Sequence, residues 1–139
     1  MPDSSSESLR LRRPGWLLAL APALCATVAI LVFGLAQPLT EHDHTFQVND
    51  KTQHFAVFLL VGYCYIRAAK HLYPTKSAIV QRVQAASAAV GLGALLEVLQ
   101  SRLPYRSAEF LDLVADAAGV GCAVLGASLV DGRSTRDVQ

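Results

Sequence analysis

The stretch GALLEVLQSRLPYRSAEFLDLVADAAG, residues 93–119, joins two apolar helical patterns across a short turn that contains Pro104. Both patterns carry carboxylates near this turn, where a membrane helix is expected to carry none: Glu97 in the first, Asp112 and Asp116 in the second. Residues spaced i, i+3 and i, i+4 lie on one face of a helix, so Asp112 and Asp116 share a face. The stretch therefore predicts a helical hairpin that builds a polar pocket just below one membrane surface.

The composition of the chain favours a membrane protein over a soluble one. Of its 139 residues, 53% are hydrophobic and only 17% are charged, whereas soluble domains carry about a quarter charged residues. The net charge of +1 says nothing about nucleic acid, but no basic patch is interleaved with aromatic residues, so no nucleic-acid partner is predicted. The cysteines lie singly in different apolar blocks, so no disulfide framework is predicted.

The apolar blocks predict an all-α fold, a four-helix transmembrane bundle. We expect helices at about residues 15–36, 50–69, 77–101 and 108–130, each close to the ~20 apolar residues that cross a bilayer. The first block exceeds the ~7–15 residues of a signal-peptide core, so we interpret it as a retained span. The predicted organisation is a disordered basic arm at 1–14, the transmembrane domain at 15–130 and a polar tail at 131–139.

Small residues recur every four positions in the last two predicted helices. They form two stripes: Ala85, Ala89 and Gly93, and then Ala115, Gly119, Ala123 and Ala127. Such stripes let membrane helices approach closely, so we expect them at helix–helix contacts.

The distribution of Lys and Arg predicts the orientation of the spans. With both termini cytoplasmic, the inner side holds most of the bases: Arg10, Arg12, Arg13, Arg67, Lys70, Lys76, Arg82, Arg133 and Arg136. The outer side then holds only Lys51, Arg102 and Arg106. This asymmetry fits the positive-inside rule, so we predict that both termini are cytoplasmic.

Ionisable residues from three predicted helices fall at a similar depth. With a rise of ~1.5 Å per residue, His54, Glu97 and Asp112 each lie roughly 6 Å from the outer ends of their helices. Asp116 lies roughly 12 Å in, towards the middle of a ~30 Å hydrocarbon core. A carboxylate at the centre of a membrane helix costs about 2.5–3.5 kcal/mol, so these side chains should face inward. The depth pattern predicts a functional site, and a polar clamp that fixes helix register is the structural alternative.

The residues that we predict to bind a ligand come from these helices and the turn between them: Asp50, Lys51, His54, Glu97, Gln100, Arg106, Asp112 and Asp116. Asp50 lies on the face of His54, and Gln100 lies one turn from Glu97. Glu109 is set aside, because an acid in the first turn of a helix is explained by the helix dipole.

Four motifs together resemble the VanZ-like family of small bacterial membrane proteins. They are DKTQHF at 50–55, EVLQ at 97–100, the Pro104-x-Arg106 turn and LDLVADAAG at 111–119, and the resemblance covers residues 50 to about 126. The family often has Asn where this chain has Asp116. It is named for a protein that gives resistance to the glycopeptide teicoplanin. The resemblance implies a multi-pass protein of the bacterial inner (plasma) membrane and cell envelope, with a role in antibiotic resistance, and it implies no reaction.

The first interpretation of the pocket is a binding protein. Lys51 and Arg106 would hold an anionic group at the outer leaflet, such as a lipid phosphate or a cell-wall precursor, because the Arg fork matches phosphate oxygens. The acids would orient these cations and contact hydroxyls or amines of the ligand. The partners expected are therefore the lipid bilayer and a lipid-linked cell-wall precursor or a glycopeptide. A thin bundle of this kind also leaves a homo-oligomer open.

The alternative is an intramembrane enzyme that acts on a lipid-linked substrate. The catalytic candidates are His54, Glu97, Asp112 and Asp116, with Asp112 or Glu97 as general base and His54 sharing the acid–base role. No cofactor or metal is predicted, although Glu97, Asp112 and Asp116 leave Mg²⁺ open for an enzyme. We find no nucleophile motif, P-loop or HExxH, and we rank this alternative lower.

A third interpretation is proton or ion translocation. It needs a second polar layer towards the cytoplasm, and Gln81, Arg82 and Gln84 lie too near the inner surface to supply one.

Overall fold

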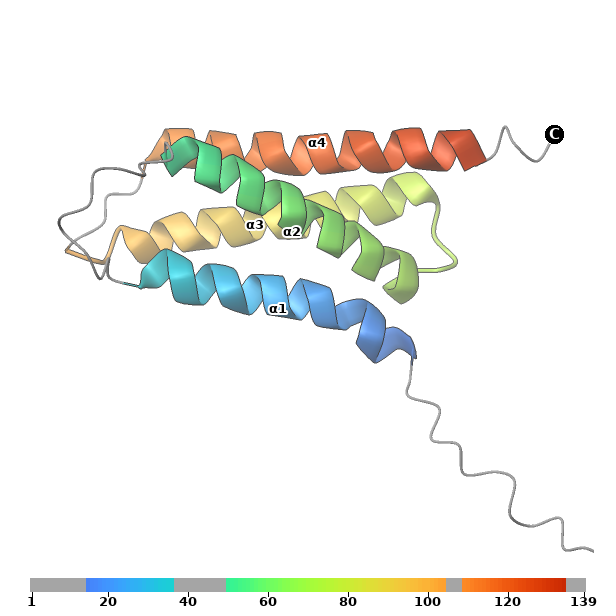
Figure 1. The fold of residues 1–139 in the computed structure, drawn as a ribbon, viewed down its shortest axis with the longest axis horizontal. Helices are drawn as coiled ribbons and strands as arrows, with labels where there is room; N and C mark the ends of the chain where they lie inside the picture. The colour runs from blue at the N-terminus through green and yellow to red at the C-terminus, as the bar shows by residue number, and fades with distance from the viewer. Residues whose placement is uncertain (1–14, 37–49, 105–108, 135–139) are drawn as a thin grey trace, which may run out of the picture.

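The fold is an all-α bundle of four helices, in agreement with the prediction from the apolar blocks. The structure is a computed structural model that describes residues 15–36, 50–104 and 109–134. The helices are α1 (Gly15–Leu35), α2 (Asp50–Leu72), α3 (Ala78–Gln100) and α4 (Phe110–Ser134), and successive helices run in opposite directions (Figure 1). Each is long and apolar enough to cross a membrane, which supports a multi-pass membrane protein.

Two helices extend further than the sequence predicts, at the end of the bundle that we call the Asp131 end. Helix α2 continues past residue 69 to Leu72, and α4 continues past residue 130 to Ser134. An ion pair joins the two extensions, with Lys70 Nζ 2.9 Å from Asp131 Oδ1. Residues assigned from sequence to a loop and to the polar tail therefore lie on helices and neutralise each other.

The other terminal and loop predictions fall largely outside the structure. The basic arm at 1–14, the loop at 37–49 and residues 135–139 of the tail lie outside the described residues, as do residues 105–108, where α4 was expected to begin. At the opposite end of the bundle, which we call the Asp50 end, α4 begins at Phe110, after the described and non-helical Glu109.

Helix α2 is the centre of the bundle, because it packs against all three other helices and most extensively against α4. Glycines allow this close approach. A Cβ atom added at Gly119 of α4 would meet the carbonyl oxygen of Phe55 and would lie 2.8 Å from the backbone nitrogen of Leu59. A Cβ atom added at Gly62 of α2 would lie 3.0 Å from Cβ of Ala123. The predicted small-residue stripe of α4 is thus confirmed as a packing surface.

An apolar core occupies the middle of the bundle and separates its two polar ends. Phe58, Val61, Ala89 and Val120 belong to one cluster of buried side chains, contributed by α2, α3 and α4. These apolar side chains lie between the two polar ends of the bundle.

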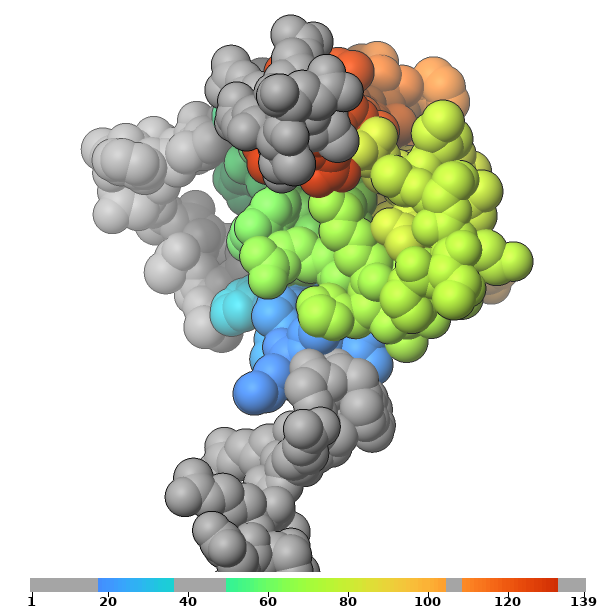
Figure 2. Space-filling view, turned by 90° about the vertical axis from the view of Figure 1, so that its right-hand side faces the viewer, coloured from blue at the N-terminus to red at the C-terminus, as the bar shows by residue number. Residues whose placement is uncertain are grey.

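Helix α1 lies at the margin of the bundle. It packs on α2 and α3 and makes no contact with α4 in the described part of the chain. Figure 2 looks onto the Asp131 end and shows residues of the α2–α3 connection between α1 on one side and α4 on the other. A hydrogen bond of 2.7 Å between Thr27 Oγ1 and Tyr65 OH joins α1 to α2. The limited packing of α1 leaves room for a cavity beside it.

The outward surface of the helices is apolar. Large hydrophobic side chains with more than half of their area exposed occur on all four helices, including Phe33 at 75%, Leu60 at 60%, Ile79 at 71%, Phe110 at 78% and Leu129 at 68%. In a soluble monomer such a surface would be a liability, whereas lipid chains are its natural surroundings. The bundle surface therefore fits contact with a lipid bilayer.

Candidate functional site

A hydrogen bond between His54 of α2 and Asp116 of α4 lies at the centre of the candidate site. His54 Nδ1 is 2.9 Å from Asp116 Oδ1, and Asp116 is fully buried. Gly93 of α3 provides the space for this carboxylate, because a Cβ atom at Gly93 would lie 2.6 Å from Asp116 Oδ2. Three helices therefore meet around one intramembrane carboxylate, as the depth pattern of the sequence predicts.

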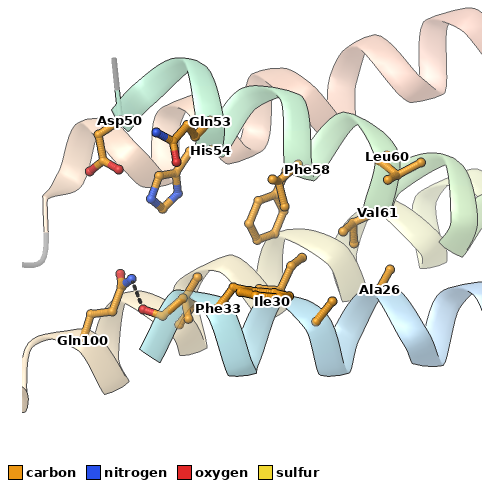
Figure 3. Close-up of a pocket in the computed structure, with 14 residues that line it drawn as sticks. Ala26, Ile30, Phe33, Asp50, Gln53, His54, Phe58, Leu60, Val61 and Gln100 are labelled. Carbon is orange, nitrogen blue, oxygen red and sulfur yellow. Dashed lines mark hydrogen bonds between the residues drawn. The ribbon is translucent and has the colours of Figure 1, made fainter. Parts of the chain in front are cut away.

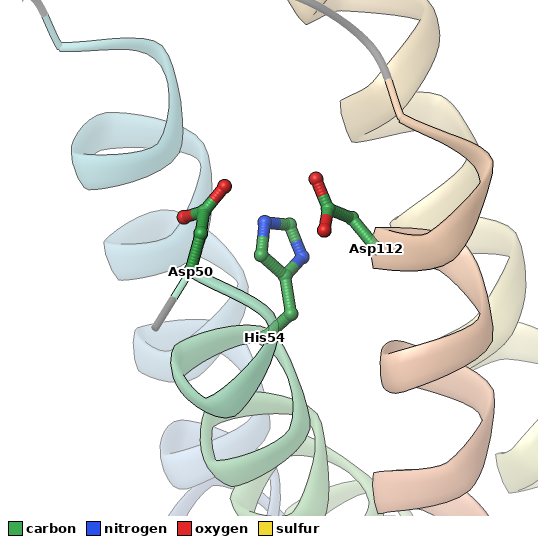
Figure 4. Close-up of side chains that lie close together, drawn as sticks. All are labelled: Asp50, His54 and Asp112. Atoms are coloured by element: carbon green, nitrogen blue, oxygen red, sulfur yellow. The ribbon is translucent and has the colours of Figure 1, made fainter. Parts of the chain in front are cut away.

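Asp50 and Asp112 lie on either side of the same imidazole (Figure 4). Asp112 is 3% exposed, whereas Asp50, the first residue of α2, is exposed. One ligand atom from each of Asp50, His54 and Asp112 lies within 4.8 Å of the others. We call Asp50, His54, Glu97, Asp112 and Asp116 together the acid cluster.

Glu97 brings α3 into the acid cluster and closes the hairpin between α3 and α4. Its Oε2 accepts a hydrogen bond of 3.1 Å from the backbone N–H of Glu109, just before α4 begins. Glu97 is buried. Its Oε1, like Asp116 Oδ2, has no hydrogen-bond partner among the residues that the structure describes. The cluster therefore contains carboxylate oxygens that the protein itself leaves unsatisfied.

Glu109, which was set aside in the prediction from the sequence, contacts the site in the structure. Its Oε2 accepts a hydrogen bond of 2.7 Å from Lys51 Nζ, and the same ammonium lies 3.5 Å from Asp112 Oδ1. Lys51 thus contacts two carboxylates, that of Asp112 on α4 and that of Glu109 just before α4. The signal was present in the sequence, because Glu109 lies one turn before Asp112 on the same face.

The Lys51–Glu109 pair leads to a prediction about pH. The Lys51 ammonium lowers the pKa of the exposed Glu109 carboxyl. A lowered pKa in the folded state means that the pair contributes stability above the ordinary carboxyl pKa and loses it as the pH falls through the lowered value. We expect Lys51→Gln to raise the Glu109 pKa towards its ordinary value and Lys51→Arg to keep it low. An NMR titration of the Glu109 carboxyl carbon in micelles measures this, and an unchanged pKa in Lys51→Gln would contradict the pairing.

Gln100 connects α3 to α1 at the same end of the bundle. Its Nε2 donates a hydrogen bond of 2.9 Å to the carbonyl oxygen of Gly34, and its side chain is buried. This bond is drawn in Figure 3. Gln100 therefore holds the end of α1 beside the acid cluster.

A cavity of about 290 Å³ opens between α1 and α2 next to the acid cluster; we call it the α1–α2 cavity. In Figure 3 its polar residues, which include Asp50, Gln53, His54 and Gln100, lie at one end. Its apolar wall continues along both helices and includes Ala26, Ile30, Phe33, Phe58 and Val61. The cavity is thus amphipathic, with its polar end at the acid cluster.

The Asp131 end has a second polar group, which is an ion-pair network. Arg82 and Lys70 both pair with Asp131, at 2.6 and 2.9 Å. Gln81 Nε2 donates to the carbonyl oxygens of Tyr73 and Lys76. These groups serve helix ends and the α2–α3 connection, and the apolar core separates them from the acid cluster. The arrangement gives no support to the translocation interpretation.

Among the predicted ligand-binding residues, Arg106 lies outside the described residues. All the others lie at the Asp50 end: Asp50, Lys51, His54, Glu97, Gln100, Asp112 and Asp116. In comparisons with known proteins, no family model, no curated protein and no solved structure matches this chain.

Proposed function

We propose that this chain is a VanZ-like integral membrane protein of the bacterial cell envelope that binds an amphipathic, lipid-linked or cell-wall-related ligand. The observation that carries the proposal is the α1–α2 cavity, whose apolar wall continues into a polar end at the acid cluster. Ligand sites are mostly apolar with a few convergent polar groups. The orientation taken from the Lys and Arg distribution places this polar end near the outer leaflet of the inner membrane.

The shape of the cavity suits a long-chain lipid rather than a compact polar molecule. Its volume of about 290 Å³ is at the lower end of ligand pockets, which span roughly 300–1,000 Å³. The chain of a lipid-linked ligand needs only one segment inside the protein, because the rest remains in the bilayer. Phe33 and Val57 line the apolar part and would contact that segment. His54 and Gln100 at the polar end would contact the head group.

An anionic head group also needs cations, and Lys51 and Arg106 are the residues that we propose for this role. Lys51 is held by Glu109, half of whose side chain is exposed, so a ligand phosphate can take the place of that carboxylate. A protein that holds a cell-wall precursor at the outer leaflet would shield it from a glycopeptide. Tolerance of teicoplanin is the expected cellular consequence.

A filled cavity should abolish binding, and this prediction tests the proposal. Ala29 lines the cavity, so Ala29→Trp is expected to weaken binding of a labelled undecaprenyl-pyrophosphate-linked precursor in nanodiscs at least tenfold, about 1.4 kcal/mol. Ala118→Trp is the control, because Ala118 is exposed on α4 and outside the cavity lining. Lys51→Gln combined with Arg106→Gln tests the proposed charge contact in the same assay. Equal affinity of wild type and Ala29→Trp, or no saturable binding by either, would contradict the proposal.

The second candidate function is an enzyme, favoured by the His54–Asp116 hydrogen bond. A carboxylate that orients an imidazole is the arrangement of a general base and its positioning group. The same nanodisc experiment separates the two functions. Precursor recovered unchanged after long incubation is the result expected of a binding protein. Time-dependent conversion that His54→Ala abolishes would assign catalysis instead.

A further inference from the structure

The acid cluster contains a set of three potential metal ligands from three helices. Single ligand atoms of His54, Glu97 and Asp116 lie within 4.8 Å of one another. They come from α2, α3 and α4 respectively. Glu97 is 8% exposed and Asp116 is fully buried, so this set lies inside the bundle rather than on its surface.

Two oxygens of this set lack a donor. Glu97 Oε1 and Asp116 Oδ2 are buried without a hydrogen-bond partner among the described residues. A buried unsatisfied acceptor costs about 1–3 kcal/mol, and more when it is charged. The ammonium of Lys51 is paired with Glu109 and Asp112. A protonated His54 would balance the charge of Asp116, so the two carboxylates together still need one further positive charge, from a cation or a proton.

We propose that His54, Glu97 and Asp116 bind a divalent transition-metal ion. The mixture of one imidazole and two carboxylates suits an ion such as Mn²⁺, which accepts oxygen ligands and tolerates nitrogen. With metal–ligand bonds of about 2.1 Å, neighbouring ligands of an octahedral ion lie about 3.0 Å apart. Without an ion, His54 Nδ1 and Asp116 Oδ1 share a proton in a hydrogen bond of 2.9 Å. An ion bound by both atoms would replace this proton, which would be released to solvent, and the two atoms already have the spacing of neighbouring ligands. Glu97, which has a carboxylate oxygen within 4.8 Å of the other two ligand atoms, would complete the set.

The location of the set also gives the ion access and open coordination positions. His54 lines the α1–α2 cavity, so an ion on its imidazole is reached from the polar end of that cavity. Two carboxylates balance the charge of a divalent ion, and the cavity side is left for water or a ligand oxygen. The inference goes beyond the proposed function, because the ion is held by side chains alone and needs no lipid.

The test is metal binding by the full-length chain in detergent after removal of metals with a chelator. We expect one Mn²⁺ per chain by calorimetric titration. The electron spin-echo spectrum of the bound ion should show modulation from an imidazole nitrogen. Glu97→Gln and Asp116→Asn, which keep the side-chain shape, should each weaken Mn²⁺ binding at least tenfold. Asp131→Asn is the matched control, because that carboxylate lies at the other end of the bundle, and its affinity should equal that of wild type.

Three outcomes would overturn the metal site: less than one ion per chain, no nitrogen modulation, or unchanged affinity in both Glu97→Gln and Asp116→Asn. Circular dichroism and gel filtration establish that each variant is folded, and the nitrogen modulation of the wild type needs no variant. Precursor binding measured with metal-free protein keeps this test separate from the proposed function, because either result can fail while the other holds.

Discussion

Replacing Gly119 with alanine is expected to destabilise the bundle by about 3 kcal/mol, at the upper end of the range for overpacked sites. The added methyl group would meet the carbonyl oxygen of Phe55 and lie 2.8 Å from the backbone nitrogen of Leu59. Both atoms belong to the backbone of α2, which cannot rotate away as a side chain can. To make room for the methyl group, α2 and α4 must move apart, although they form the most extensive helix contact in the bundle. Unfolding in mixed micelles with increasing dodecyl sulfate measures the loss.

Gly121→Ala is the matched control, because a Cβ atom at Gly121 has no neighbour within 4 Å. It has the same chemical change on the same helix, two residues further on. Alanine favours a helix over glycine by about 1 kcal/mol, so this variant should be as stable as wild type or more so. Equal stability of the Gly119 and Gly121 variants would contradict the packing of α2 on α4.

Most of the fold could be predicted from the sequence, because it depends on properties that act along a single helix. Four apolar blocks, each long enough to cross a bilayer, predict the four helices that the structure shows. The spacing of Gly119 and Ala123 on one face of α4 predicts the close contact between α4 and α2. The ends of α2 and α4 were predicted less well. They depend on pairing between Lys70 and Asp131, which lie far apart in the sequence.

The sequence predicted which residues lie at the candidate site better than it predicted which of their side chains contact each other. Counting depth along each helix placed His54, Glu97 and Asp112 at one level and Asp116 deeper in the same outer part of the bundle, and all four lie close to one another in two overlapping groups. Depth does not give the rotation of each helix about its axis, so the sequence could not show that Lys51 meets Glu109.

The sequence predicted a polar pocket at the hairpin between α3 and α4, but it did not predict a cavity between α1 and α2. This cavity depends on how far α1 lies from α2 and on the bond from Gln100 to Gly34. Neither the separation of two helices nor a contact between distant residues can be read from apolar spacing. The space that Gly93 leaves for Asp116 is a further example, because the spacing of small residues predicted only a helix-packing role for Gly93.

The account depends on His54 and Asp116 meeting inside the bundle, and the second large effect concerns this pair. We expect His54→Ala and Asp116→Ala each to cost roughly 3 kcal/mol, because each removes one partner of a buried pair and leaves the other unsatisfied. The double variant should cost less than the sum, since it leaves no unpaired group. Hydrogen bonds in membrane proteins show coupling energies of about 0.6 kcal/mol on average and about 1.7 at most. Full burial of Asp116 places this pair near the upper value.

The measurement that tests the account most directly is the double-mutant cycle of His54 and Asp116, with unfolding free energies determined in mixed micelles that contain a chelator. The chelator removes any contribution of a bound ion. The same cycle between His54 and Asp131, which lie at opposite ends of the bundle, should give additive effects. A coupling of about 1.5 kcal/mol between His54 and Asp116 is the predicted result. Additivity of this pair within about 0.5 kcal/mol would show that the two side chains do not meet, and would contradict the acid cluster.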